Sequence, residues 1–215
     1  MRTSLQFTSL VWLTLLASST ARGSSLLPDS AAKEFQRKLA RSEIHLNESW
    51  QNGKVRQVGA VLVLLEDGVP AKAFHTLAQQ KPYPRVWHLD DYARLEIVNG
   101  KASSAEPSPS KAFTHLSRGE LLVVLNHKFK GDAIELWTHT LNPVEPAAGD
   151  GKQSRQHAST KLVFRFPPEV LASGDVAAIL AEMKQWFRVF ESESEAREFA
   201  EAVRSEQTPS TGRAF

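Results

Sequence analysis

The sequence predicts an α+β fold that is mainly β: a small antiparallel barrel or bent sheet covered by a C-terminal amphipathic helix, with a short N-terminal helix. Three observations lead to this class. Between residues 57 and 167, short aliphatic and aromatic runs alternate with Gly, Pro or polar clusters at intervals of about ten residues, which is typical of small barrels and sandwiches. Residues 175–190 carry apolar side chains at helical spacing, and residues 29–41 show the same spacing on a thinner face.

The composition describes an ordinary globular chain. Its 215 residues suit one domain or two small ones, and a hydrophobic content of 41% is enough to bury a core. The formal net charge is +2, and the Lys and Arg residues are scattered among Asp and Glu. A nucleic-acid-binding protein would show a basic stripe, so we expect no nucleic-acid partner.

Residues 1–21 have the pattern of a secretory signal peptide. Arg2 is followed by an apolar run, Leu10–Ala17, and small residues precede a predicted cut after Ala21. The run is shorter than the ~20 residues that span a bilayer, so we expect cleavage and no integral membrane span afterwards; an uncleaved anchor is the alternative. The chain has no cysteine, which excludes disulfides and thiolate metal sites and fits a periplasmic or secreted bacterial protein.

The predicted organisation has four parts. In the N-terminal helical segment, Asp29 or Ser30 caps a short helix whose apolar face holds Phe35 and Leu39. The parts are the signal peptide at 1–21, an N-terminal helical segment at 22–56, a β-rich domain with its closing helix at 57–190, and a C-terminal helix with a disordered tail at 191–215.

The β-rich domain is predicted from a series of short strands. Lys130–Asp132 connects two of them as a hairpin, with Gly131 available for a positive φ. Two segments rich in Pro, Gly and Ser, residues 103–111 and 145–156, interrupt the series as exposed loops. The predicted strands lie within residues 58–68, 71–78, 85–89, 93–102, 119–129, 133–143 and 161–166.

The stretch Lys161–Leu171 changes from a strand pattern to a helix pattern. Pro167 lacks the amide that a central strand needs and therefore ends the strand. After a chain reversal over residues 169–174, Asp175 caps a helix that covers the sheet. This helix is predicted over residues 175–190, with one apolar face made of Val176, Ile179, Leu180, Met183 and Phe187. A capping box at residues 192–195 begins the last helix.

Three stretches together resemble an uncharacterised family of exported bacterial β-rich proteins. They are "VGAVLVLLEDGV" (58–69), "GELLVVLNHKFKGDAIELWTHT" (119–140) and "STKLVFRFPPEVLASGDVAAILAEMKQWF" (159–187), the last with an FxFP junction between a strand and a helix. The resemblance covers about residues 55–190. It implies export and a β-rich core, and it implies no activity, cofactor or catalytic residue.

The richest polar cluster is "WHLDDY", residues 87–92. In it, His88 beside Asp90 or Asp91 could orient an imidazole or bind a metal. His127 and His139 flank the predicted hairpin and could approach each other across it, with Glu135 on the same strand face as His139. Surface or cross-strand polar pairs are the alternative that we favour. The candidate binding residues are Trp87, His88, Asp90, Asp91, His127 and His139, and we assign no catalytic residue and no metal ligand.

The sequence carries none of the common catalytic motifs. "SAAK" (30–33) and "SPSK" (108–111) match the Ser-x-x-Lys pattern but lack the companion Lys-Thr-Gly, so both are read as coincidences. Trp50, Tyr83 and the cationic "KPYPR" (81–85) suggest a surface for an envelope protein, a peptide or a glycan. The alternative is that Trp50 and Trp87 fill the core. We predict an exported, non-catalytic binding or envelope-associated module without a cofactor. The alternative is a metal- or histidine-dependent hydrolase.

Overall fold

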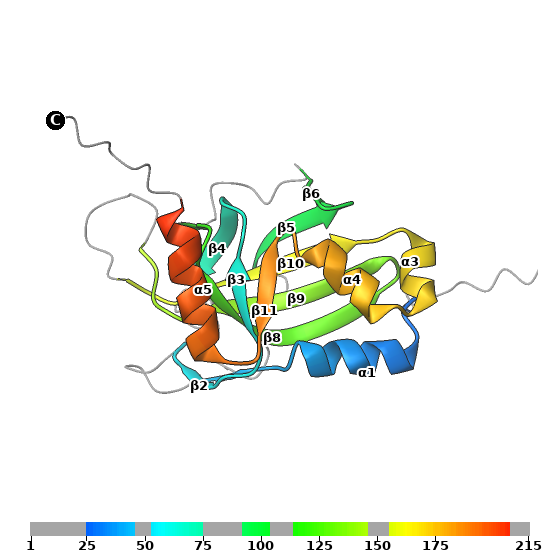
Figure 1. The fold of residues 1–215 in the computed structure, drawn as a ribbon, viewed down its shortest axis with the longest axis horizontal. Helices are drawn as coiled ribbons and strands as arrows, with labels where there is room; N and C mark the ends of the chain where they lie inside the picture. Colours follow the sequence, from blue (N-terminus) through cyan, green and yellow to red (C-terminus); the bar gives the residue numbers. More distant parts are fainter. Residues whose placement is uncertain (1–24, 46–52, 75–91, 104–113, 146–154, 207–215) are drawn as a thin grey trace, which may run out of the picture.

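The computed structural model describes residues 25–45, 53–74, 92–103, 114–145 and 155–206 (Figure 1). Within them, strands predominate and form a curled sheet, a half-barrel, with helices packed against it. The predicted α+β, mainly β class is therefore confirmed. The elements are α1 (Asp29–Lys38), β1 (Glu43–Ile44), β2 (Val55–Gln57), β3 (Val61–Leu64), β4 (Val69–Ala73), β5 (Ala93–Val98), β6 (Lys101–Ala102), β7 (Thr114–Leu116), β8 (Leu121–Lys130), β9 (Ala133–Thr140), β10 (Ala158–Arg165), α3 (Pro168–Ser173), α4 (Val176–Met183), β11 (Phe187–Phe190) and α5 (Glu193–Ser205).

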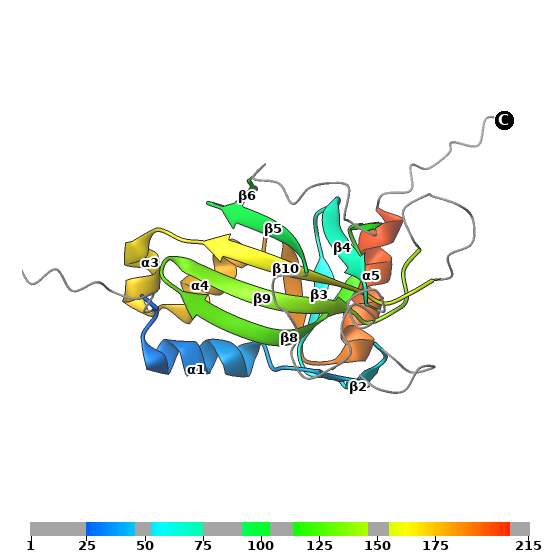
Figure 2. The same ribbon diagram turned by 180° about the vertical axis from the view of Figure 1, so that it is seen from behind.

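The main sheet has the order β11-β3-β8-β9-β10-β4-β7 (Figures 1 and 2). Its centre is the antiparallel trio β8, β9 and β10, and the predicted hairpin joins β8 to β9. Two strands pair with the edge of β10 that lies away from β9. Ala158–Ser159 pair with β4, whereas Thr160–Arg165 pair with β5. The β5–β10 pairing is parallel, so the sheet departs from the purely antiparallel arrangement at this edge. β1 and β2 form a separate two-stranded sheet.

The two faces of the sheet are covered by different helices, because alternate side chains of a strand point to opposite faces. On the face that we call the α4 face, Leu62, Leu122 and Leu162 pack with side chains of α1, α3 and α4. On the opposite face, the α5 face, Val63 and Val123 pack under Ala196 and Ala200 of α5, together with Val61 and Leu121. Ala196 and Ala200 therefore lie on the side of α5 that docks on the sheet.

The predicted helix over residues 175–190 is wrong at its C-terminal half. Asp175 caps α4 as expected, since its Oδ1 accepts a hydrogen bond from the Ala178 amide at 3.0 Å. The helix ends at Met183, and β11 follows and pairs with β3. Four of the five side chains of the predicted apolar face are nevertheless buried: Val176, Ile179 and Met183 on α4, and Phe187 on β11. The segment expected to reverse the chain before Asp175 is a short helix, α3, with Pro168 in its first turn.

The half-barrel is closed at one side by Trp186. Its Nε1 donates a hydrogen bond to the carbonyl oxygen of Gly100, in the β5–β6 turn, at 3.0 Å. The Trp186 carbonyl accepts a hydrogen bond from the Leu65 amide at 2.9 Å, just after β3. One side chain thus links the β3–β11 edge to the β5–β6 hairpin.

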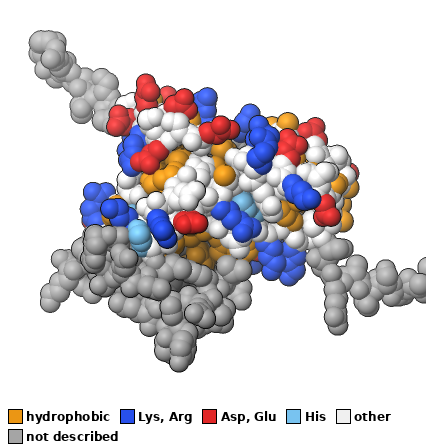
Figure 3. All heavy atoms as spheres, turned by 90° about the horizontal axis from the view of Figure 1, so that it is seen from below, with side chains coloured by type: hydrophobic (Ala, Val, Ile, Leu, Met, Phe, Trp, Pro, Cys, Tyr) orange, Lys and Arg blue, Asp and Glu red, His pale blue; other side chains and the backbone are white. Residues whose placement is uncertain are grey.

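Charged side chains of both signs are interspersed over the described part of the face seen in Figure 3. This mixture on the surface agrees with the scattered charges in the sequence. Among the described residues, no helix has the length and apolar character needed to cross a membrane. The predicted signal peptide at 1–21 lies outside the described residues.

Candidate functional site

Only two of the six candidate binding residues, His127 and His139, lie within the described residues. Trp87, His88, Asp90 and Asp91 lie outside the described residues, so their part of the prediction stays a prediction. His127 and His139, which could have approached each other across the hairpin, lie on opposite faces of the sheet. His127 packs on the α4 face beside Phe35 of α1, whereas His139 lies on the α5 face.

A β-bulge in β8 separates the two histidines. The register shifts between Val124 and Asn126, so that His127 lies opposite Leu136 and His139 lies opposite Val123. One extra residue in a strand turns every later side chain to the other face of the sheet. Strict alternation, on which the prediction depended, would have placed both imidazoles on one face.

His127 connects the end of α1 to the sheet. Its Nε2 donates to the carbonyl oxygen of Leu39 at 2.6 Å, and its Nδ1 accepts from Nε of Arg41 at 3.2 Å. Burial lowers its pKa to about 4, and the Arg41 charge acts in the same direction. A neutral imidazole with both nitrogens engaged has a structural role here.

His139 forms a second buried network, with Ser159 and Gly53. Its Nε2 donates to the carbonyl oxygen of Gly53 at 2.6 Å, which leaves Nδ1 as the acceptor for the Ser159 hydroxyl at 2.7 Å. Burial lowers the pKa of His139 to about 3, with a smaller effect from His157, whose ring stacks on it at 5.3 Å. The Tyr92 hydroxyl also bonds Ser159, and burial raises the pKa of Tyr92.

The Ser159–His139 pair has the hydrogen bond of a nucleophile and its base. Both side chains have 0% exposure, however, so a substrate has no route to the hydroxyl in this structure. Within the described ranges, no group of three His, Asp or Glu side chains is arranged to hold a metal ion. The network anchors the Gly53 segment to the α5 face.

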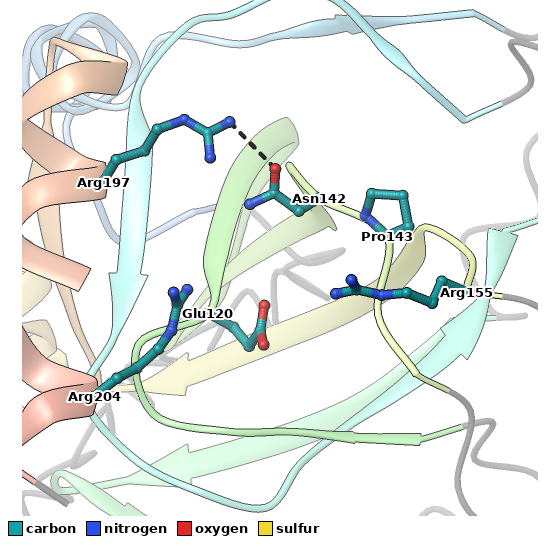
Figure 4. Close-up of a pocket in the computed structure, with 6 residues that line it drawn as sticks. All are labelled: Glu120, Asn142, Pro143, Arg155, Arg197 and Arg204. Atoms are coloured by element: carbon teal, nitrogen blue, oxygen red, sulfur yellow. Dashed lines mark hydrogen bonds between the residues drawn. The ribbon is translucent and has the colours of Figure 1, made fainter. Parts of the chain in front are cut away.

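A concave site lies where α5 meets the ends of the central strands (Figure 4). Its volume is about 630 Å³. We call it the arginine pocket. Its lining residues in the described part of the chain are Glu120 before β8, Asn142 and Pro143 after β9, Arg155 before β10, and Arg197 and Arg204 of α5.

The three arginines are fixed by different partners. Arg197 pairs with Glu193 one turn earlier on α5 at 2.7 Å and donates to Oδ1 of Asn142 at 3.2 Å. Arg204 donates through Nη2 to the carbonyl oxygen of Gly119 at 2.6 Å. Because a guanidinium has five N–H donors, these two side chains keep donors to offer a ligand.

Arg155 and Glu120 complete the polar lining. Arg155 pairs at 3.2 Å with Glu145, and both of these side chains are largely exposed. Burial raises the pKa of Glu120, against the opposite effects of the Arg204 and Arg155 charges. Figure 4 shows its carboxyl group between these two arginines.

Sequence reasoning missed this site because its residues carry no motif. Arg197 and Arg204 are about two helical turns apart, and their spacing reads as the solvated face of an amphipathic helix. Asn142 lies shortly before the segment 145–156, which was predicted as an exposed loop, and Arg155 lies within that segment. Only the folded sheet brings the strand ends and α5 to one place.

No protein-family model, curated protein or solved structure matches this chain. The class of the protein is therefore defined by its own fold and site, a mainly β half-barrel with an arginine-lined pocket at one end. The pocket chemistry is the basis for the functional interpretation.

Proposed function

We propose that the protein is an exported, non-catalytic binding module that takes a small anionic ligand in the arginine pocket. The observation that carries this proposal is the gathering of three guanidinium groups around one cavity of about 630 Å³. Guanidinium groups pair with carboxylate and phosphate oxygens through planar, often bidentate hydrogen bonds.

The size and lining of the pocket favour a small polar ligand. Ligand pockets commonly have volumes of roughly 300–1,000 Å³, and about 630 Å³ falls within this range. The pocket-lining side chains in the described part of the chain are charged or amide groups apart from Pro143, so an apolar ligand would find little contact area. The paired carboxylates of Glu193 and Glu145 reduce the positive charge without filling the cavity.

A binding role fits the lining better than catalysis does. The described lining has no Ser, Thr, Lys or His, and the buried Ser159–His139 pair lies apart from it. The metal- or histidine-dependent hydrolase stays an alternative prediction, because its proposed residues His88 and Asp90 lie outside the described ranges.

Calorimetric titration of the purified protein with inorganic phosphate and with succinate tests the pocket. We expect binding of at least one anion, and Arg155→Gln and Arg197→Gln should each weaken it about tenfold, since a hydrogen bond to a charged group contributes roughly 1.5–3 kcal/mol. Arg37→Gln on α1 removes the same charge from an exposed position and is the matched control. No binding of either anion, or an equal loss in the control, would overturn the proposal.

Export rests on the pattern of residues 1–21. After expression in a Gram-negative host, the intact mass of the periplasmic protein should correspond to a chain that starts at Arg22. A full-length chain in the membrane fraction would instead support the uncleaved anchor. In an exported protein, the anionic group bound by the pocket would be part of an envelope protein, a peptide or a glycan.

A further inference from the structure

We propose that the ligand of the arginine pocket carries an ammonium or hydroxyl donor beside its anionic group, and that the Glu120 carboxylate accepts this donor. The inference rests on the proposed function and specifies its ligand as an amino- or hydroxy-substituted anion. A carboxylate inside an anion site weakens the binding of a simple anion by like-charge repulsion. Its presence in the pocket therefore selects for a second group on the ligand.

Glu120 is held in place by its backbone. Its amide donates to the carbonyl oxygen of Ser117 at 3.1 Å, and its carbonyl accepts from the Leu64 amide at 2.9 Å, just before β8. The side chain is half-buried and forms part of the pocket wall. The backbone at this strand end therefore fixes the point from which the Glu120 side chain enters the pocket wall.

The neighbouring arginines make their close contacts elsewhere. Arg204 donates to Gly119, Arg155 pairs with Glu145, and Arg197 pairs with Glu193. Among the described residues, the structure has no ion pair between Glu120 and any of these guanidinium groups. The direction of the Glu120 pKa agrees, because burial outweighs the attraction of the two nearest arginine charges.

The pocket wall therefore offers both hydrogen-bond donors and hydrogen-bond acceptors to one ligand. The guanidinium groups offer N–H donors to an anionic group, and Glu120 offers acceptor oxygens to a donor on the same molecule. Asn142 lies on the wall as well, and its Oδ1 already accepts from Arg197. A molecule with both an anionic group and a donor satisfies the two sides at once, whereas a simple anion leaves a half-buried carboxylate without a partner.

Succinate, malate and aspartate form a matched series for the test, because they share four carbons and two carboxylates and differ at one substituent, H, OH or NH₃⁺. Calorimetric titration of the wild-type protein should give malate or aspartate an affinity about tenfold or more above that of succinate. In Glu120→Gln this preference should fall below about threefold, and succinate should bind more tightly than to the wild type. Glu169→Gln, an exposed position on α3, removes the same charge and should keep the preference.

The outcomes separate the two proposals. Absence of binding for all three compounds and for phosphate in the wild type would overturn the anion-binding function, and this inference with it. Binding of phosphate without binding of any of the three compounds would overturn this inference alone. Equal affinity for the three compounds, or an unchanged preference in Glu120→Gln, would overturn this inference alone. Because equal affinities in the wild-type series would already overturn this inference, it stays open to disproof even where the variant folds poorly.

Discussion

The burial of His139 makes the stability of the protein depend on pH. Its pKa of about 3, and that of about 4 for His127, lie below the ordinary value of 6.5 because burial disfavours the charged imidazole. The pKa of His157 is also lowered, by burial and by the nearby Lys54 charge. Below pH 6.5 the unfolded chain binds protons that the folded chain excludes. Stability is therefore full above pH 6.5 and falls as the pH drops toward 3.

Urea denaturation between pH 7.5 and 4.5 measures this effect. We expect the free energy of unfolding to fall with pH by up to about 1 kcal/mol per unit for each buried histidine. His139→Gln removes one such group and should flatten the dependence, whatever its effect on the absolute stability at pH 7.5. A slope identical to that of the wild type would contradict the assigned role of His139.

Gly59 is a second residue whose identity is set by close packing. A Cβ added there would lie 2.3 Å from the carbonyl oxygen of Ala40, which is backbone and cannot move aside. Its amide donates to Oγ of Ser42 at 2.7 Å. We expect Gly59→Ala to destabilise the protein by roughly 2–4 kcal/mol through overpacking and a lost contact.

Gly68 provides the comparison for Gly59. It has a φ of +80° but no neighbour within 4 Å of an added Cβ. Gly68→Ala should therefore cost about 1 kcal/mol from backbone strain alone. Thermal denaturation that ranks Gly68→Ala as the more damaging change would contradict the packing argument for Gly59.

Among the elements, α4 packs against its face of the sheet through its buried side chains. Ile179 is fully buried, and the next residue, Leu180, is only partly buried. We expect Ile179→Ala to lower the free energy of unfolding by roughly 2–5 kcal/mol, since it leaves a cavity in the core. Leu180→Ala should cost clearly less in the same denaturant titration, and equal losses would show that α4 is packed differently.

The boundary between α4 and β11 shows what the sequence could predict. Val176, Ile179 and Met183 follow helical spacing, so the existence of the helix and its buried face were predictable. Phe187 fits both a helical stripe and the alternating pattern Phe187, Val189 of a strand. Residues 187–190 form a strand because the edge of β3, which is far away in the sequence, offers them backbone hydrogen-bond partners.

The candidate site was less predictable than the fold for a similar reason. The bulge in β8 that moves His127 to the α4 face leaves no motif in "VVLNHKF". The arginine pocket depends on where α5 docks, which no local pattern specifies. Local patterns thus predict elements, whereas side chains that meet through long-range pairing require the structure.

At the scale of the whole molecule, the arginine pocket joins α5 to the sheet. A ligand held by Arg197 and Arg204 on one side and by Arg155 on the other would connect the C-terminal helix to the strand ends. Binding to the folded state alone raises stability by about 2.7 kcal/mol at a ligand concentration of 100 times Kd.

We therefore expect aspartate at saturating concentration to raise the Tm by several degrees and to slow hydrogen exchange of α5 amides. Sodium chloride at the same ionic strength is the control, and it should not reproduce the protection because it screens charges without bridging them. A Tm gain that occurs without protection of α5 would place the binding site elsewhere.

The shared edge of β10 has a consequence for how the chain reaches this structure. The β8–β9 hairpin closes through a short turn, whereas β5 must find β10 from a distant part of the chain. Closing long loops costs more entropy, and distant pairings slow folding. We therefore expect the hairpin to form early during refolding and the parallel pairing of Leu95 with Leu162 to form late.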